Sequence, residues 1–284
     1  MTAAPNPIER FSLPRGDGQG DYVVYLSRPE GEAKDVPVIF VLDADMAFSL
    51  AVEVANLRAI GGAFPRPVLV GIGYGANFAE MAKLRTGDLT PPTSAEGAAA
   101  LGNMTSLIGD KSGGADALLA FIVDSLAPEI SRRCPEASKT RRILYGHSLA
   151  GLFTAYALLT RPDAFEAFLA SSPSLWWDGF AVLKHLPGFA EHRKKLGQLP
   201  RVMVAVGGTE QDVPTEVPPS LNMDLAQVQA IVTMARMVDG AAEFAVALRD
   251  AGLTNVHHVC FTDEDHASVI PPSFNRGLTI ALKP

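Results

Sequence analysis

Short apolar runs alternate along this chain with segments of helical character, and this alternation is the feature that most limits its fold. The run Val36–Leu42 is apolar throughout, and RPVLVGIGYG, RRILYGH and RVMVAVGG have the same character. Strands that are apolar at every position are typical of parallel sheets covered by helices on both faces. We therefore predict an α/β fold with a mostly parallel central sheet.

The remaining segments complete this alternation. Helices are expected over 47–60, from Ala115 to Leu126, and over 222–252, where one long or two abutting helices fit. FSLPRGDGQGDYVVYLS predicts two strands around a Gly/Asp turn, FEAFLASS a strand that ends near Ala170, VHHVCF a last strand and SFNRGLTIAL a closing helix. Neither an internal repeat nor a linker is visible, so we predict one domain over 1–284.

Residues 76–114 interrupt the pattern with many Gly, Pro, Thr and Ser residues. Irregular segments of this length inside a compact domain are usually functional or mobile. We expect a lid-like insertion or a mobile loop here, and the sequence does not decide between the two.

Charge and composition exclude several classes of function. The chain has a net charge of -7, contains no block of Lys or Arg, and is 48% hydrophobic. This argues against nucleic acid and against an anionic membrane as partners. Cys134 and Cys260 are the two cysteines, and without a Cys-x-x-Cys pair they are expected as separate reduced thiols.

Targeting signals are also missing from the sequence. The stretch MTAAPNPIERF has neither a basic region nor an apolar region of a secretory signal, and no apolar run approaches the ~20 residues of a membrane span. We expect a cytoplasmic protein, and the sequence leaves open whether it is a monomer or a homo-oligomer.

The segment YGHSLAGLF places Ser148 between an expected strand and an expected helix. A tight turn there needs small residues two positions before and after the serine, and Gly146 and Ala150 meet that need. The pattern matches the G-x-S-x-G nucleophile elbow, with alanine at its last position. A serine that only caps the helix is the alternative interpretation.

The same turn predicts an oxyanion hole. The N–H of Leu149 at the helix N-terminus would be one donor, and the loop after VIFVLD would supply the second. We expect the backbone N–H of Asp45 to be that second donor, with Ala44 and Met46 also within reach.

A serine nucleophile needs a base, which follows it in the order Ser, acid, His in chains of this type. His266 lies in a loop directly after the last expected strand, where it can reach the elbow. His257 and His258 lie inside that strand and are expected to be structural.

The acid should follow the strand RVMVAVGG. Glu210 comes first after that strand and is preferred over Asp212, and its role would be to orient the imidazole of His266. The carboxylates of 263–265 could also orient His266, so this assignment stays open.

The segment GIGYG, Gly71–Gly75, resembles a dinucleotide-binding loop only in part, because its spacing is G-x-G-x-G. A turn that leads into the insertion is the favoured interpretation. No Walker loop, H-E-x-x-H motif or EF-hand loop is found, so neither a cofactor nor a metal is expected.

Several separate motifs resemble one family in the same order along the chain: YGHSLAGLFTAYALLTRP, ASSPSLWWD, RTGDLTPP, GGADALLAFI and EDHASVIPP. They are similar to the esterase-D-like esterases of the α/β-hydrolase superfamily, and the nearest branch contains the siderophore trilactone esterases. The resemblance extends from about residue 22 to the C-terminus.

This resemblance implies a small-molecule ester substrate and hydrolysis without a cofactor, with Ser148 as nucleophile and His266 as base. It leaves open whether Glu210 completes a triad or a Ser-His pair suffices. Trp176, Trp177 and Arg85 match family motif positions and would either bind substrate or pack the core and lid. Acyl transfer at the same site and non-catalytic binding are the alternatives.

Overall fold

One sheet forms the centre of the molecule. The computed structural model describes residues 7–16, 18, 20–29, 34–100, 109, 111–217 and 223–283. Its eight-stranded sheet has the order β1-β2-β4-β3-β5-β6-β7-β8. The strands are β1 (Glu9–Pro14), β2 (Asp21–Ser27), β3 (Val36–Val41), β4 (Val68–Gly73), β5 (Ala137–His147), β6 (Ala167–Ser171), β7 (Arg201–Gly207) and β8 (Val256–Phe261).

Most of the sheet is parallel, as predicted. The strands β3 to β8 run in one direction, while β2 is antiparallel to both β1 and β4. Because parallel strands end at the same edge of a sheet, the loops after β3, β5, β6, β7 and β8 all lie at one edge.

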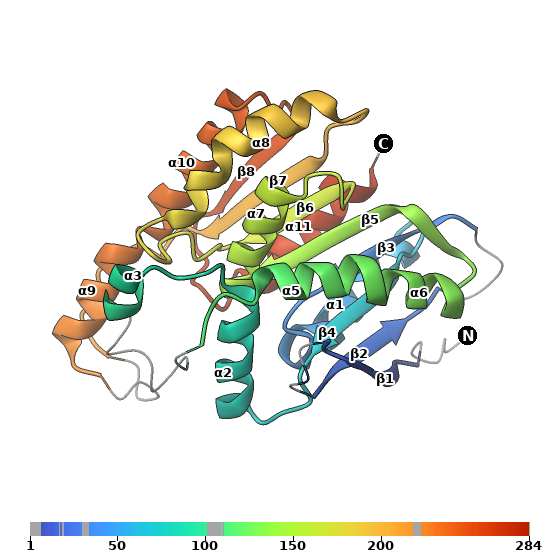
Figure 1. Ribbon diagram of the computed structural model, residues 1–284, viewed down its shortest axis with the longest axis horizontal. Helices are drawn as coiled ribbons and strands as arrows, with labels where there is room; N and C mark the ends of the chain where they lie inside the picture. Colours follow the sequence, from blue (N-terminus) through green and yellow to red (C-terminus); the bar gives the residue numbers. More distant parts are fainter. Residues whose placement is uncertain are drawn as a thin grey trace.

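Helices cover both faces of the sheet (Figure 1). The core beside α1 and α11 contains apolar residues of those two helices, and the core on the other face contains residues of α5 to α8 and of α10. The helices are α1 (Ala44–Ile60), α2 (Phe78–Leu89), α3 (Ala95–Ala100), α5 (Ala115–Ala120), α6 (Ala127–Arg133), α7 (Leu149–Thr160), α8 (Leu186–His192), α9 (Leu225–Ala235), α10 (Met237–Asp250) and α11 (Ile270–Leu282).

The apolar runs form strands because both of their faces are covered. In β3, Val38 and Phe40 belong to the core beside α7, while Ile39 and Val41 belong to the core beside α1 and α11. All residues of β3 and β4 are buried. The prediction of an α/β fold with a mostly parallel sheet is confirmed.

The insertion over 76–114 is more regular than its composition indicated. The expectation of an irregular segment is wrong for α2 and α3, while residues 101–108 and 110 lie outside the described residues. The Asn77 side chain accepts a hydrogen bond from the N–H of Glu80 and so caps α2. Met81 and Leu89 bury their side chains, so tertiary contacts outweigh the glycine inside this helix.

The stretch expected over 222–252 forms two abutting helices, α9 and α10, and Asn222 lies outside the described residues. Arg236 separates them with a left-handed φ of 44°. A residue in this conformation cannot continue an α-helix, so the chain turns between the two.

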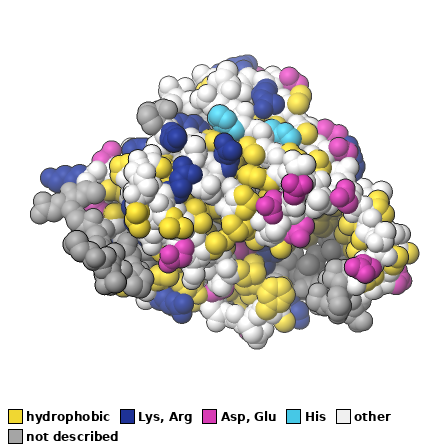
Figure 2. Space-filling view, turned by 180° about the vertical axis from the view of Figure 1, so that it is seen from behind, with side chains coloured by type: hydrophobic (Ala, Val, Ile, Leu, Met, Phe, Trp, Pro, Cys, Tyr) yellow, Lys and Arg dark blue, Asp and Glu magenta, His cyan; other side chains and the backbone are white. Residues whose placement is uncertain are grey.

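Figure 2 shows the molecule from behind, where α1 and α11 cover the sheet. Hydrophobic side chains lie among the charged ones, and a group of Lys and Arg side chains lies apart from a group of Asp and Glu side chains. Within the described part of the chain, no helix is long and apolar enough to cross a membrane.

Candidate active site

Ser148 lies at the turn between β5 and α7, in a backbone conformation that a serine rarely adopts. Its φ is 61° and its ψ is -121°, which is a region favoured by glycine. Although Ser148 precedes the first residue of α7, its side chain makes no capping hydrogen bond. The helix-cap interpretation is therefore wrong, and the hydroxyl is available for other contacts.

Small residues make this turn sterically feasible. A Cβ atom on Gly146 would lie 2.1 Å from the carbonyl oxygen of Ala150, and one on Gly151 would lie 2.7 Å from that of Ser171. Neither distance is compatible with a side chain. The turn therefore needs glycine at Gly146, and α7 needs glycine at Gly151 to approach the end of β6.

Three side chains from separate loops meet at the turn. His266 follows β8, and its Nε2 lies 3.0 Å from the Oγ of Ser148. Its Nδ1 lies 2.6 Å from the Oε2 of Glu210, which follows β7. The structure thus brings together serine, histidine and carboxylate in the order expected from the sequence.

The carboxylate of Glu210 is held from its far side. Its Oε1 accepts hydrogen bonds from the Ser172 hydroxyl at 2.5 Å and from the Gly207 N–H at 2.6 Å. The Glu210 side chain is only 1% exposed, whereas that of His266 is 48% exposed. The site therefore has a fixed, buried anion behind a histidine that faces solvent and the serine.

His147 lies beside this group on the buried side. Its ring centroid is 4.6 Å from that of His266, and its Nδ1 lies 3.1 Å from the Ser171 Oγ. A chain of hydroxyl contacts continues from Ser171 to Ser273 and then to Tyr145. Burial, and then the charges of His266 and Arg85, hold the pKa of His147 well below its ordinary value.

A cavity of about 480 Å³ opens in front of Ser148. Most of its wall is apolar and comes from α1, α2 and the start of α11, while Ser148, the two histidines, Asp43 and Arg85 are polar parts of the lining. Deep apolar cavities with a few convergent polar groups are the usual form of small-molecule sites. The lining residues are Leu42, Asp43, Met46, Ala47, Leu50, Phe78, Met81, Ala82, Arg85, Tyr145, His147, Ser148, His266, Ala267, Ile270 and Pro271.

The two predicted oxyanion donors differ in where they lie relative to the cavity. Leu149 is the first residue of α7, so its N–H has no acceptor inside the helix. Asp45 is not among the residues that line the cavity. Its carboxylate instead accepts hydrogen bonds from the Tyr25 hydroxyl at 2.5 Å and the Tyr74 N–H at 2.6 Å, and so fixes the loop after β4.

Of the three residues predicted to bind substrate, one lines the cavity and two do not. Arg85 lines the cavity and makes a two-pronged ion pair with Asp43, at 2.8 and 2.6 Å. Trp176 and Trp177 do not line it. Trp177 is 3% exposed, and its indole N–H donates to the Thr93 hydroxyl at 2.9 Å, which links the insertion to the core.

Sequence reasoning missed Asp43 and Ser172. Asp43 lies two residues after the end of β3 and pairs with a residue 42 positions away, and Ser172 bonds to a carboxylate 38 positions away. Neither contact leaves a local pattern, and the available signal was their position within two residues of the end of a strand. His257 and His258 lie on β8, outside the lining of the Ser148 cavity, and no group of three or more metal-binding side chains occurs among the described residues.

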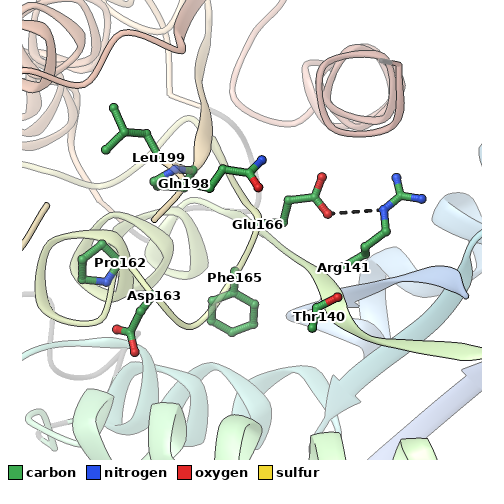
Figure 3. Close-up of a pocket in the computed structure, with 9 residues that line it drawn as sticks. Thr140, Arg141, Pro162, Asp163, Phe165, Glu166, Gln198 and Leu199 are labelled. Carbon is green, nitrogen blue, oxygen red and sulfur yellow. Dashed lines mark hydrogen bonds and ion pairs between the residues drawn. The ribbon is translucent and has the colours of Figure 1, made fainter. Parts of the chain in front are cut away.

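A second cavity, of about 370 Å³, lies where β6 and β7 begin (Figure 3). Arg141 and Glu166 form an ion pair of 3.4 Å across it. Its lining residues include no serine, cysteine or histidine. Ligands of parallel sheets bind at the carboxyl ends of the strands, so the cavity at Ser148 is the stronger candidate.

Comparisons with known proteins agree with this geometry. A family model described as "Putative esterase" matches residues 19–245. A siderophore triacetylfusarinine C esterase of Aspergillus fumigatus is 34% identical, over 99% of this chain and 96% of its own length. The ferri-bacillibactin esterase BesA of Bacillus subtilis is 30% identical, over 93% of this chain and 85% of its own length.

Solved structures give the same result. The siderophore hydrolase EstB from Aspergillus nidulans has a TM-score of 0.78 at 31% identity, and covers 99% of this chain and 96% of its own. Its relative EstA from the same organism has a TM-score of 0.81 at 26% identity, and covers 95% and 92%. The chain therefore belongs to this esterase family, and it is a serine hydrolase of the α/β-hydrolase fold that cleaves ester bonds.

Proposed function

We propose that Ser148, His266 and Glu210 form the catalytic triad of this esterase and that its substrate is a siderophore ester. The contacts from Ser148 to His266 and from His266 to Glu210 carry this proposal, because a serine hydroxyl becomes a nucleophile only beside a base that is itself oriented.

In the first half of the reaction, the Oγ of Ser148 attacks the ester carbonyl carbon while its proton passes to Nε2 of His266. The C–O bond to the alcohol then breaks, and His266 returns the proton to the departing alcohol. In the second half, His266 takes a proton from water, the hydroxide attacks the acyl carbon, and the bond to Ser148 Oγ breaks as the serine regains a proton.

Two backbone N–H groups would stabilise the oxyanion that forms in each half. Leu149 supplies one from the N-terminus of α7. We propose Asp43 as the source of the second, because it lies in the short turn between β3 and α1 and lines the cavity together with Ser148. Its left-handed φ of 52° turns the backbone at that point. The prediction for Asp45 stays untested.

The relatives support a siderophore ester as substrate, since two of them are named esterases of triacetylfusarinine C and of ferri-bacillibactin. The relatives also favour hydrolysis over acyl transfer and over non-catalytic binding. One domain over 1–284, a lid role for the insertion and a cytoplasmic location remain predictions from the sequence.

Exchange of the nucleophile tests this function. Ser148→Ala should abolish hydrolysis of a p-nitrophenyl ester and of a cyclic siderophore ester, and it should end labelling by a fluorophosphonate. Mass spectrometry of the products measures hydrolysis of the siderophore ester. Ser174→Ala is a matched control, because the Ser174 hydroxyl lies 3.5 Å from that of Ser148 and should be dispensable. Turnover retained by Ser148→Ala would refute the assignment, as would labelling lost only in Ser174→Ala.

A further inference from the structure

The cavity at Ser148 contains one positive and one negative side chain, and they neutralise each other. Among its lining residues, Arg85 and Asp43 carry full charges. Both nitrogen-oxygen contacts of this pair are short, and the side chains are only 14% and 7% exposed. In a two-pronged pair, the carboxylate accepts from the same guanidinium N–H groups that would otherwise bind an anionic ligand.

His147 adds no fixed positive charge to the cavity. His147 is held neutral near pH 7, because burial, followed by the charges of His266 and Arg85, holds its pKa well below the ordinary value. The remaining lining residues from α1, α2 and α11 are uncharged. An anionic group that entered this cavity would lose its hydration without gaining a partner cation.

Several acidic residues lie next to residues of the site in the sequence. Asp263, Glu264 and Asp265 directly precede His266, and Asp45 lies two positions after Asp43. The chain as a whole has a net charge of -7. Lys83 lies on α2 near Arg85, but it lines a different cavity, whose charged lining residues are Arg15, Glu80, Lys83, Asp88 and Lys111. The net negative charge of the chain therefore disfavours an approaching anion.

We infer that this site selects uncharged esters over anionic ones, and that Asp43 sets this selectivity by neutralising Arg85. The inference rests on the proposed ester hydrolysis at Ser148 and deepens it. Within the siderophore esters, it favours substrates whose acyl and alcohol parts carry no net charge over those that carry several negative charges.

Two p-nitrophenyl esters of equal chain length test the inference. The pentanoate is neutral and the monoglutarate ends in a carboxylate. Wild-type enzyme should hydrolyse the pentanoate with the higher kcat/KM, because the carboxylate of the monoglutarate loses hydration in the cavity without gaining a partner cation. Asp43→Asn leaves the charge of Arg85 unpaired and should reduce this ratio, by about 30-fold if that charge acts over ~8 Å at an effective dielectric constant of ~20.

Two further variants keep the test independent of the folding of Asp43→Asn. Arg85→Gln leaves the charge of Asp43 unpaired and should raise the ratio of neutral to anionic turnover. Lys83→Gln removes a positive charge from the same helix, but Lys83 lines another cavity. This variant should leave the ratio of neutral to anionic turnover unchanged.

Equal or faster wild-type turnover of the monoglutarate would overturn the inference while leaving ester hydrolysis intact. The same holds if the ratio stays constant in a folded Asp43→Asn and in Arg85→Gln. If wild-type enzyme hydrolyses neither these esters nor a siderophore ester, the proposed function itself fails, and this inference fails with it.

Discussion

Replacing Glu210 by glutamine keeps the shape of the side chain and removes its charge. In the folded protein, Oε1 accepts hydrogen bonds from Ser172 and Gly207, while Oε2 faces Nδ1 of His266. A glutamine satisfies the two donors only if its oxygen takes the place of Oε1. Its NH₂ group then points at His266, favours a proton on Nε2, and prevents that nitrogen from accepting the proton of Ser148.

The magnitude follows from the charge that forms during the reaction. When His266 accepts the proton, a positive ring faces a negative carboxylate, with the centres of charge about 4 Å apart. At an effective dielectric constant of ~20 this attraction is worth about 4 kcal/mol. Its loss corresponds to a decrease of about a thousandfold in kcat/KM.

The assay compares the initial rates of p-nitrophenyl ester hydrolysis by Glu210→Gln and by Asp212→Asn, with circular dichroism to verify the fold. Asp212 is the neighbouring carboxylate on the same loop, is exposed, and should be dispensable. A folded Glu210→Gln that retains more than about a third of wild-type kcat/KM would refute the reasoning and favour a Ser148-His266 pair without an acid.

Three other perturbations test the surroundings of the site. Gly146→Val should lower the free energy of unfolding by about 3 kcal/mol in urea titrations, because its Cβ would lie 2.1 Å from the carbonyl oxygen of Ala150. Trp177→Phe removes the hydrogen bond to Thr93 and should cost about 1 kcal/mol of stability with KM unchanged, whereas a raised KM at constant Tm would indicate a substrate contact. Folding lowers the pKa of His147, so the unfolded chain binds more protons than the folded one below about pH 6.5. Stability should therefore fall as the pH decreases below ~6.5, and His147→Gln should flatten that decrease in urea midpoints.

The sequence predicted the parts of the molecule that local pattern controls. β3 and β5 are apolar at the positions that face both layers of helices. The turn at Ser148 needs small neighbours, and these can be read directly from the sequence. The placement of His266 followed from its position after the last strand, since the carboxyl ends of parallel strands share one edge.

Contacts between distant segments were not predictable in this way. The composition of the insertion concealed α2, because its Asn77 cap and its buried Met81 depend on tertiary packing. Nothing near Arg85 in the sequence indicates Asp43 as its partner. Similarly, the local sequence placed Asp45 in the expected loop, but it did not indicate that the Asp45 carboxylate accepts hydrogen bonds from Tyr25 and Tyr74.

The backbone at Ser148 has a consequence for how this protein can change under selection. A serine with a φ of 61° and a ψ of -121° raises the free energy of the folded state by roughly 1–3 kcal/mol, and glycine would relieve most of that strain. Selection for stability alone would therefore replace Ser148 by glycine. With serine at this position, the chain gives up folding stability to keep one hydroxyl in place, which is a trade-off between stability and activity located at a single residue.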